Sequence, residues 1–359
     1  MALAMSARSR FLSVPIVPFE VAPGLTVRDI LARMQGISFQ GRNLARAHAA
    51  WRAMLNDDVL IFLGTAGALS AGGLRLLLAH LVRERFVDCV VTTGANLYHD
   101  LHETLGRHHF RGHPGADDCA LKEDGIDRVY DTYASEDEFV ENDSWIAAFT
   151  ATLERRPYTT REYLYTLGER LWATTGRHGF LTAAYRAQVP IFCPALADSS
   201  IGMGISQARH ADPAAGQIDV IGDIIESANL VVRHPRTASI VLGGGTPKNF
   251  INQASVQAAF YHPAISGHAY AIQIITDVPH FGGASGASLD EAKSWGKLDS
   301  EATRVTVQAD ATLALPLLVS ALAETQPASC RAPLVRFDPS GPTMHVDGRP
   351  LSRAFEISE

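Results

Sequence analysis

The sequence repeats one pattern several times: a short run of apolar, β-branched residues, then a turn of small residues, then leucines at helical spacing. The first copy predicts a strand at Val59 to Leu63, a turn at Gly64 to Ala68 and a helix over Gly72 to Val82. A second strand is predicted at Val87 to Val91 and ends in Thr92-Thr93-Gly94. This alternation is typical of βαβ units, so it predicts an α/β fold around a mainly parallel sheet.

Four further strands are predicted in the second half of the chain, over 189–193, 239–242, 271–275 and 305–308. All six strand ends are followed by Gly, Ser, Thr or Asp. In an open parallel sheet ligands bind beyond the carboxyl ends of the strands, where such residues can approach a phosphate or hold a ribose. One such turn indicates little, because ordinary tight turns use the same residues. Six of them together favour a nucleotide site.

Helices with one apolar face are also predicted over 26–34, 41–55 and 160–172, whereas the acidic stretch 117–143 is expected to be loop-like. The sequence shows no internal repeat, and we expect a single nucleotide-binding domain. The expected boundaries are an N-terminal extension with an amphipathic helix (1–38), a catalytic domain (39–325) and a C-terminal tail (326–359).

Composition excludes several classes of partner. A formal net charge of -7, without any block of basic residues, argues against a nucleic-acid surface. The 4 cysteines are scattered without a CxxC pair, so we expect reduced thiols in a cytoplasmic protein. The segment Met1 to Phe19 lacks the apolar core of a signal peptide, and the apolar run Ala311 to Ala323 contains Pro316 and is too short to span a bilayer.

The most distinctive local motif is Glu-Ala-Lys-Ser-Trp-Gly-Lys, from Glu291 to Lys297, which follows the glycine-rich stretch Gly282 to Gly286. A lysine beside tryptophan and glycine can be desolvated, and desolvation favours the neutral amine that forms Schiff bases. A lysine after glycine is more often a solvated surface residue, so the spacing alone is weak.

Two other clusters carry less specific signals. Gly243-Gly244-Gly245 follows an apolar strand and could bring the chain close to a pyrophosphate, with Lys248 as a charge partner, although it is neither GxGxxG nor a P-loop. Five histidines lie between His99 and His113, but their spacing fits no common zinc motif, so no metal is expected. No GxSxG elbow is present, so acyl-enzyme chemistry has little support.

These pieces occur in the order found in the deoxyhypusine synthase family, which the sequence resembles over Phe39 to Leu322. The most specific match is Asp-Glu-Ala-x-Ser-Trp-Gly-Lys, ending at Lys297. The other matching segments are Phe39 to Leu44, Phe62 to Arg75, Val91 to Thr93, Cys193 to Asp198, Leu242 to Lys248 and Ala309 to Ala311.

The resemblance implies a Rossmann-like, doubly wound NAD-binding domain in a homotetramer with active sites at subunit interfaces, and it makes Lys297 the imine-forming lysine. Glu291 and Trp295 match substrate-pocket positions, as a carboxylate for an ammonium and an aromatic wall for the carbon chain. The family's nucleotide-binding residues fall on Thr65, Thr92, Thr93, Asp198, Gly243, Gly244, Gly245, Thr276, Asp310 and Ala311.

The chain also departs from the family pattern. Met203 stands where the family places a polyamine-binding aspartate, Asn249 replaces a pocket histidine, and His99 replaces a glutamate expected near the cofactor ribose. The segment from Phe281 to Ala287 is one residue shorter than in the family and lacks its acids. Substitutes for the missing charges are expected among Asp277, His280 and Asp100.

These departures, with Pro247-Lys248-Asn249-Phe250 and Thr92 to Leu97, resemble the bacterial branch, whose members are similar to homospermidine synthases. We therefore expect NAD-dependent aminobutyl transfer from a spermidine-like donor, through a Lys297 imine, to a small amine. The alternatives are modification of a protein lysine, transfer of another amine in a specialised pathway, a non-catalytic NAD-binding paralogue, and simple NAD-linked amine oxidation.

Overall fold

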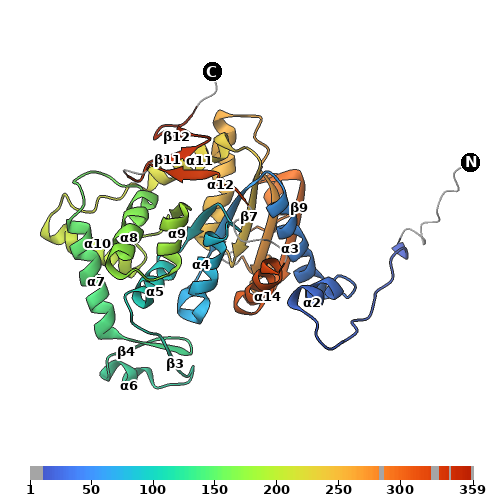
Figure 1. Ribbon diagram of the computed structural model, residues 1–359, viewed down its shortest axis with the longest axis horizontal. Helices are drawn as coiled ribbons and strands as arrows, with labels where there is room; N and C mark the ends of the chain where they lie inside the picture. Colours follow the sequence, from blue (N-terminus) through green and yellow to red (C-terminus); the bar gives the residue numbers. More distant parts are fainter. Residues whose placement is uncertain (1–10, 283–286, 325–330, 339–340, 357–359) are drawn as a thin grey trace, which may run out of the picture.

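The computed structural model describes residues 11–282, 287–324, 331–338 and 341–356 (Figure 1). Its centre is a six-stranded sheet in the order β6-β2-β1-β7-β8-β9, in which every neighbouring pair is parallel. The strands are β1 (Leu60–Thr65), β2 (Cys89–Thr92), β6 (Ile191–Phe192), β7 (Thr237–Leu242), β8 (His268–Ile275) and β9 (Leu298–Gln308). All six strands expected from the sequence lie in this sheet, so the α/β class with a mainly parallel sheet is confirmed.

The strand order reverses once, in the middle of the sheet. From β1 the chain moves outward to β2 and then β6, and it returns to place β7 on the other side of β1, followed by β8 and β9. The two halves therefore diverge between β1 and β7. In open parallel sheets this is the position where the turns after the strands leave a crevice for a ligand.

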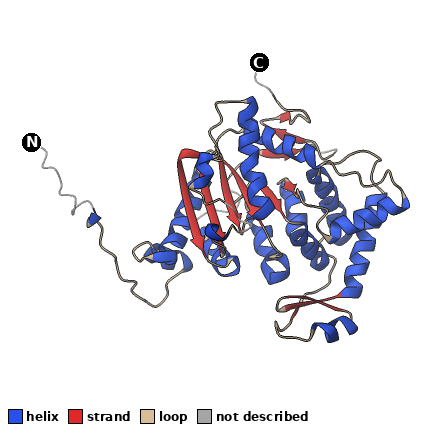
Figure 2. Ribbon diagram, turned by 180° about the vertical axis from the view of Figure 1, so that it is seen from behind, coloured by secondary structure: helices blue, strands red, loops and turns tan. Residues whose placement is uncertain are grey.

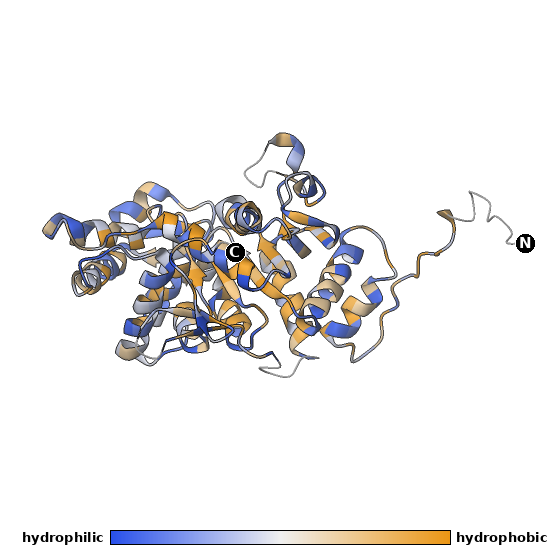
Figure 3. Cartoon of the chain, turned by 90° about the horizontal axis from the view of Figure 1, so that it is seen from above, coloured by the Kyte–Doolittle hydropathy of each residue, from blue (hydrophilic) through white to orange (hydrophobic). Residues whose placement is uncertain are grey.

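Apolar side chains on both faces of the sheet hold the helices in place. Along β1, Ile61 and Leu63 face one core, whereas Leu60 and Phe62 face the other. The helices of the first core include α3 (Phe39–Asn56), α4 (Arg75–Arg83), α5 (Gly94–Thr104) and α14 (Ala311–Ala323), and those of the second are α11 (Val220–Arg233) and α12 (Gly245–Tyr261). Figure 2 shows helices on both sides of the strands, and Figure 3 shows that the strands are largely hydrophobic.

The other helices expected from apolar periodicity are present as α2 (Val27–Met34) and α8 (Thr160–Thr175). Further helices are α9 (Phe180–Ala187) and α10 (Ser200–Ala211). Before α2 the chain extends away from the body of the molecule, and the Val17 amide donates to the Gly36 carbonyl (Figure 1). Within the described residues, no helix combines the length and apolar content needed to cross a bilayer.

The expectation of a loop over 117–143 was wrong. This region contains α6 (Asp118–Glu123), β4 (Ile126–Val129), β5 (Thr132–Ser135) and the start of α7 (Glu136–Ala151), and β5 also pairs with β3 (Phe110–Arg111). Its acidic residues are concentrated at helix starts: Asp117 caps α6, and the first turn of α7 contains three acids. Carboxylates are favoured there, because the first amides of a helix lack partners within the helix.

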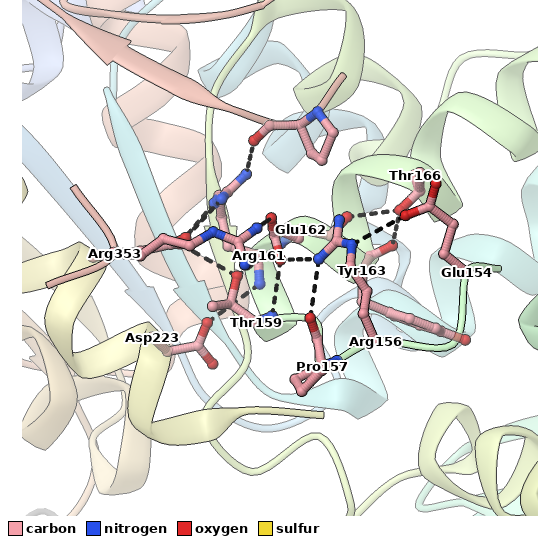
Figure 4. A network of polar contacts seen from close by, with 12 residues as sticks. Glu154, Arg156, Pro157, Thr159, Arg161, Glu162, Tyr163, Thr166, Asp223 and Arg353 are labelled. Carbon is pink, nitrogen blue, oxygen red and sulfur yellow. Dashed lines mark hydrogen bonds and ion pairs between the residues drawn. The ribbon is translucent and has the colours of Figure 1, made fainter. Parts of the chain in front are cut away.

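The C-terminal segment contains a second small sheet of β10 (Val335–Phe337), β11 (Met344–Val346) and β12 (Arg349–Pro350), which packs over α11 and α12. A buried polar network attaches it to α8 (Figure 4). Arg161 forms an ion pair of 2.7 Å with Glu226 and donates to the Pro342 carbonyl, and Arg353 pairs with Glu162. The segment is therefore integrated with the main core.

Candidate active site

A cavity of about 270 Å³ lies at the carboxyl ends of β1, β7, β8 and β9. Besides the turn after β1, it is lined by four residues that the resemblance assigns to the cofactor, Gly243, Thr276, Asp310 and Ala311. Asp277, a candidate substitute for a missing substrate charge, also lines it. This is the crevice expected from the reversal of strand order, and the structure brings these residues together there.

The glycine turn after β7 shapes one wall of this cavity. Gly243 has φ +81°, and a Cβ atom there would lie 3.1 Å from the Ala66 Cβ. The Gln273 side chain, on β8, donates to the Gly243 carbonyl at 2.9 Å. Because α12 begins at Gly245, the turn also presents the unpaired amides of a helix start, which suit a phosphate.

Three predicted threonines form the second part of the strand-end site. Thr65 donates to the Thr92 hydroxyl at 2.6 Å, and Thr93 donates to the Gly67 carbonyl at 2.6 Å. The buried amide of Asn96 reaches all three hydroxyls, at 3.2 to 3.4 Å, so it ties the β1 and β2 turns together. Asn96 was not predicted to be a site residue, although its position one helical turn after Thr92 was a usable signal.

Polar groups around these turns fit a dinucleotide. The Ser70 hydroxyl is buried and has no hydrogen-bond partner among the described residues, while its amide donates to Asn96. Hydrogen bonds from Thr312 lower the pKa of Asp310, which therefore remains ionised as an acceptor at the cavity wall. Close-approach glycines, a buried hydroxyl and carboxylates are the groups that phosphates and riboses require.

Asp198 lies exposed in the turn after β6. A Cβ atom at Gly94 would lie 2.3 Å from the Ser199 hydroxyl oxygen, so this turn packs directly on the start of α5. Asp198 is thereby held near the Thr93 turn, although it does not line the cavity at the ends of β7 to β9.

The lysine motif forms a separate group before β9. The Lys297 Nζ lies 5.4 Å from the centroid of the Trp295 ring, and the Lys297 amide donates to the Ala292 carbonyl at 3.1 Å. Its short helix is α13 (Glu291–Ser294), fixed by the buried Leu289, Ala292 and Leu298, which pack beside β8. Trp295 is 62% exposed, and Glu291 is also exposed, so the group is open on one side.

Lys248 connects the lysine group to the glycine turn. It lies in the first turn of α12, is only 2% exposed, and its Nζ donates to the Ala287 carbonyl at 2.6 Å. Burial, with a smaller contribution from the Lys297 charge, lowers its pKa to about 8, and Glu291 partly offsets both. The sequence suggested only a phosphate contact for this lysine, because its contact with a loop 39 residues away is tertiary.

Other predicted substrate residues do not join the lysine group. Met203 is 57% exposed on α10, and Asn249 is exposed beside Lys248. Asp277 lines the strand-end cavity instead. His280 is exposed, and residues 283–286 of the shortened glycine segment lie outside the described residues.

The suggestion that Asp100 replaces a missing substrate charge was wrong. Its carboxylate is fully buried, pairs with Arg75 at 3.1 Å, and accepts from the amides of Phe180 and Leu181 at the start of α9. These contacts use Asp100 to join helices, so it is not available for a substrate.

The histidine-rich segment packs internally. His99 Nδ1 lies 2.9 Å from His109 Nε2, and His109 Nδ1 lies 2.8 Å from Glu103. Burial lowers the pKa of His99 and of His102 to about 4, which leaves both rings neutral near pH 7. Among the described parts of the chain, no group of three or more His, Cys, Asp or Glu residues is arranged to hold a metal ion.

The model of the deoxyhypusine synthase family matches residues 29–322, which include every part of both groups. The chain belongs to the deoxyhypusine synthase family. This confirms the family expected from the sequence, with the match starting at residue 29 rather than 39. Enzymes of this family are transferases.

Relatives of the chain occur in archaea and bacteria. It is 44% identical to "Probable deoxyhypusine synthase 2" of Methanosarcina acetivorans, over 88% of this chain and 91% of the relative. It is 39% identical to "Deoxyhypusine synthase-like protein" of Coxiella burnetii, over 82% and 84%. A crystal structure assigned as a deoxyhypusine synthase from Entamoeba histolytica has a TM-score of 0.59 at 19% identity, covering 86% of this chain and 97% of that one, which supports a shared fold.

Proposed function

We propose that the protein is an NAD-dependent transferase that moves an aminobutyl group from a spermidine-like donor, as an imine on Lys297, to a small diamine. The observation that carries this proposal is the position of the Lys297 amine over the Trp295 ring, in the motif that includes Glu291. A carboxylate can hold an ammonium end of a polyamine, while an aromatic ring packs against its carbon chain. Lys297 is then within reach of the carbon that reacts.

NAD, bound in a Rossmann-like manner at the strand ends, would accept a hydride from the carbon beside the donor's secondary amine and later return it. Gly243 permits close approach of the nucleotide to the backbone, and the Asp310 carboxylate can accept a hydrogen bond from a ribose hydroxyl. Asn96 holds the hydroxyls of Thr65, Thr92 and Thr93. Net oxidation over a cycle is nil, so the nucleotide can stay bound while the site excludes water from the imine.

Transfer at Lys297 requires an exchange of amines. The Lys297 nitrogen bonds to the imine carbon and loses a proton, while the bond to the departing amine breaks and that amine gains a proton. The acceptor amine repeats the exchange in the opposite sense and frees Lys297. In this proposal Glu291 keeps the charged end of the chain fixed during both exchanges.

The exposed side of the lysine group supports an oligomeric enzyme. Trp295 is 62% exposed and Phe281 is 79% exposed in one subunit. A homotetramer with active sites at subunit interfaces would cover this face and enclose a flexible diamine. A fully active monomer, measured by light scattering under assay conditions, would contradict this part of the proposal.

Two kinds of acceptor, a small diamine and a protein lysine, agree equally with membership of the family. Met203 and Asn249 replace polar groups that the family pattern uses to anchor spermidine, which favours a small diamine such as putrescine. The archaeal relatives, described as probable deoxyhypusine synthases, favour a protein lysine instead. An unpaired buried ammonium costs several kcal/mol, so the ammonium groups of the donor need carboxylates other than the missing aspartate. We propose Glu291 and Asp277 for this role.

Product analysis distinguishes the two acceptors. The enzyme is incubated with NAD, spermidine and either putrescine or a translation-factor substrate protein, and products are identified by mass spectrometry. We expect homospermidine and 1,3-diaminopropane. If the protein lysine is modified and no homospermidine forms, the acceptor is a protein lysine rather than a small diamine. Stoichiometric NADH release would indicate simple amine oxidation.

A further inference from the structure

We propose that Lys248 is the proton-transfer group for Lys297, an inference that rests on the proposed function. Lys248 is a buried lysine in the first turn of α12, directly after the glycine turn. Its amine thus lies where the glycine turn meets the segment that carries Lys297.

Hydrogen bonds connect Lys248 to that segment. Its Nζ donates to the Ala287 carbonyl at 2.6 Å, four residues before α13 begins at Glu291. From there the chain is compact: the Ala292 amide donates to the Ser288 carbonyl at 3.0 Å, and the Lys297 amide donates to the Ala292 carbonyl at 3.1 Å. Hydrogen bonds therefore connect the Lys248 amine, through Ala287, to the folded segment that ends at Lys297.

Burial makes Lys248 able to exchange a proton near pH 8. Burial is the main cause that lowers its pKa to about 8, with a smaller contribution from the Lys297 charge, and Glu291 partly offsets both. Lys297 and Glu291 both come from the segment before β9. Groups with a pKa near the working pH are efficient at both accepting and returning protons.

Two neighbouring side chains are poorly suited to this role. Asn249, which follows Lys248 on α12, has an amide that does not titrate, and it is exposed. Lys293, on α13, is only half-buried, unlike Lys248, and its amine donates to the Ser300 carbonyl on β9. Lys248 combines a titratable amine with burial and with proximity to Lys297.

The proposed step balances in atoms and charge. As the Lys297 nitrogen bonds to the imine carbon, it releases one proton to the neutral Lys248 amine. The bond between that carbon and the departing amine nitrogen then breaks, and Lys248 returns the proton to the departing amine. No electron is gained or lost, and Lys248 ends the step neutral as it began.

The test follows formation of the imine on Lys297. Wild type, Lys248→Met, Lys248→Arg and the matched control Lys293→Met are mixed with NAD and spermidine between pH 6.5 and 9.5, and borohydride is added at set times. Mass spectrometry then quantifies the adduct on the Lys297 peptide. Thermal unfolding, followed by circular dichroism, checks that each variant is folded.

We expect Lys248→Met and Lys248→Arg to form the adduct roughly 100-fold more slowly near pH 8, the usual contribution of a proton-transfer group, and to lose the rise in rate around that pH. Lys293→Met should behave as wild type. Arginine keeps the charge but cannot give up its proton, so a wild-type rate in Lys248→Arg would overturn the inference, as would an unchanged pH profile in Lys248→Met. Absence of any adduct in wild type would instead overturn the proposed function, and this inference with it.

Discussion

The Lys297 amine lies 5.4 Å from the centroid of the Trp295 ring, yet Trp295 is 62% exposed. An exposed cation and aromatic ring attract each other by only about 0.5–1 kcal/mol, so the contact contributes little stability as it stands. In the proposed oligomer, substrate and a second subunit would exclude water from the pair, and attraction between a cation and a ring strengthens on desolvation. The pair is therefore better explained by reaction chemistry than by folding.

Replacement of Lys297 by methionine should abolish transfer, because methionine keeps the length of the side chain but has no amine. Borohydride treatment with NAD and spermidine should label wild type at Lys297 and leave Lys297→Met unlabelled. Lys293→Met, four residues earlier in the same segment, is the matched control and should retain activity. Activity within tenfold of wild type in Lys297→Met would show that another nucleophile carries the substrate.

Replacement of Trp295 by leucine should weaken donor binding. The loss of a desolvated cation–aromatic contact of about 2 kcal/mol corresponds to a KM for spermidine roughly 30-fold higher. The adduct on Lys297 should still form at saturating donor. Trp172→Leu is the control: Trp172, on α8, packs on Arg186 of α9, and its replacement should leave KM unchanged. Equal KM values for Trp295→Leu and wild type would remove the ring from the substrate pocket.

Replacement of Gly243 by alanine should impair NAD binding. Its φ of +81° strains any other residue by about 1–2 kcal/mol, and the new methyl group would crowd Ala66 at the cavity wall. Gly348→Ala is a matched control, because Gly348 has φ +73° in the C-terminal hairpin with no atom near its Cβ position. Both variants should lose similar stability in thermal unfolding. Calorimetry should show weaker NAD binding for Gly243→Ala alone, and equal affinity would contradict a cofactor role for this turn.

The sheet and its strand-end residues could be predicted because they depend on local pattern. Apolar, β-branched runs mark the six strands, and parallel strands necessarily bring their carboxyl ends to one edge. Gly243, Thr276 and Asp310 could thus be assigned to one site from their positions after strands. Lys297 was predictable only through its motif, since a lysine after glycine has no structural signature of its own.

Contacts between distant segments could not be predicted in the same way. The bond from Lys248 to Ala287 joins residues 39 apart, and the use of Asp100 as a cap for α9 joins residues about 80 apart. The acidic stretch after residue 117 was mistaken for a loop because charge alone does not distinguish helix caps from solvated turns. Each error concerns a polar side chain whose partner is fixed by tertiary structure.

The last prediction concerns Asp223, a fully buried carboxyl beside Arg161 and Glu226 in the network that holds the C-terminal sheet (Figure 4). Burial raises its pKa to about 7, and the nearby Glu226 carboxylate acts in the same direction. Below the unfolded pKa near 3.8, the group is protonated in both states. Between pH 4 and 7 only the unfolded chain gives up this proton, so the free energy of unfolding should fall as pH rises and level off above pH 7.

Asp223→Asn mimics the protonated form and should therefore remove this loss of stability. At pH 8 the variant should exceed wild type in free energy of unfolding by on the order of 4 kcal/mol, since the pKa of Asp223 is raised from 3.8 to about 7 and one pKa unit corresponds to about 1.4 kcal/mol. The difference should vanish near pH 4. Denaturant unfolding at pH 4.5, 6 and 8 measures it. Asp219→Asn is the control, because Asp219 is an exposed cap of the same helix and asparagine caps equally well. If the difference between Asp223→Asn and wild type is the same at all three pH values, Asp223 does not hold its proton in the folded protein.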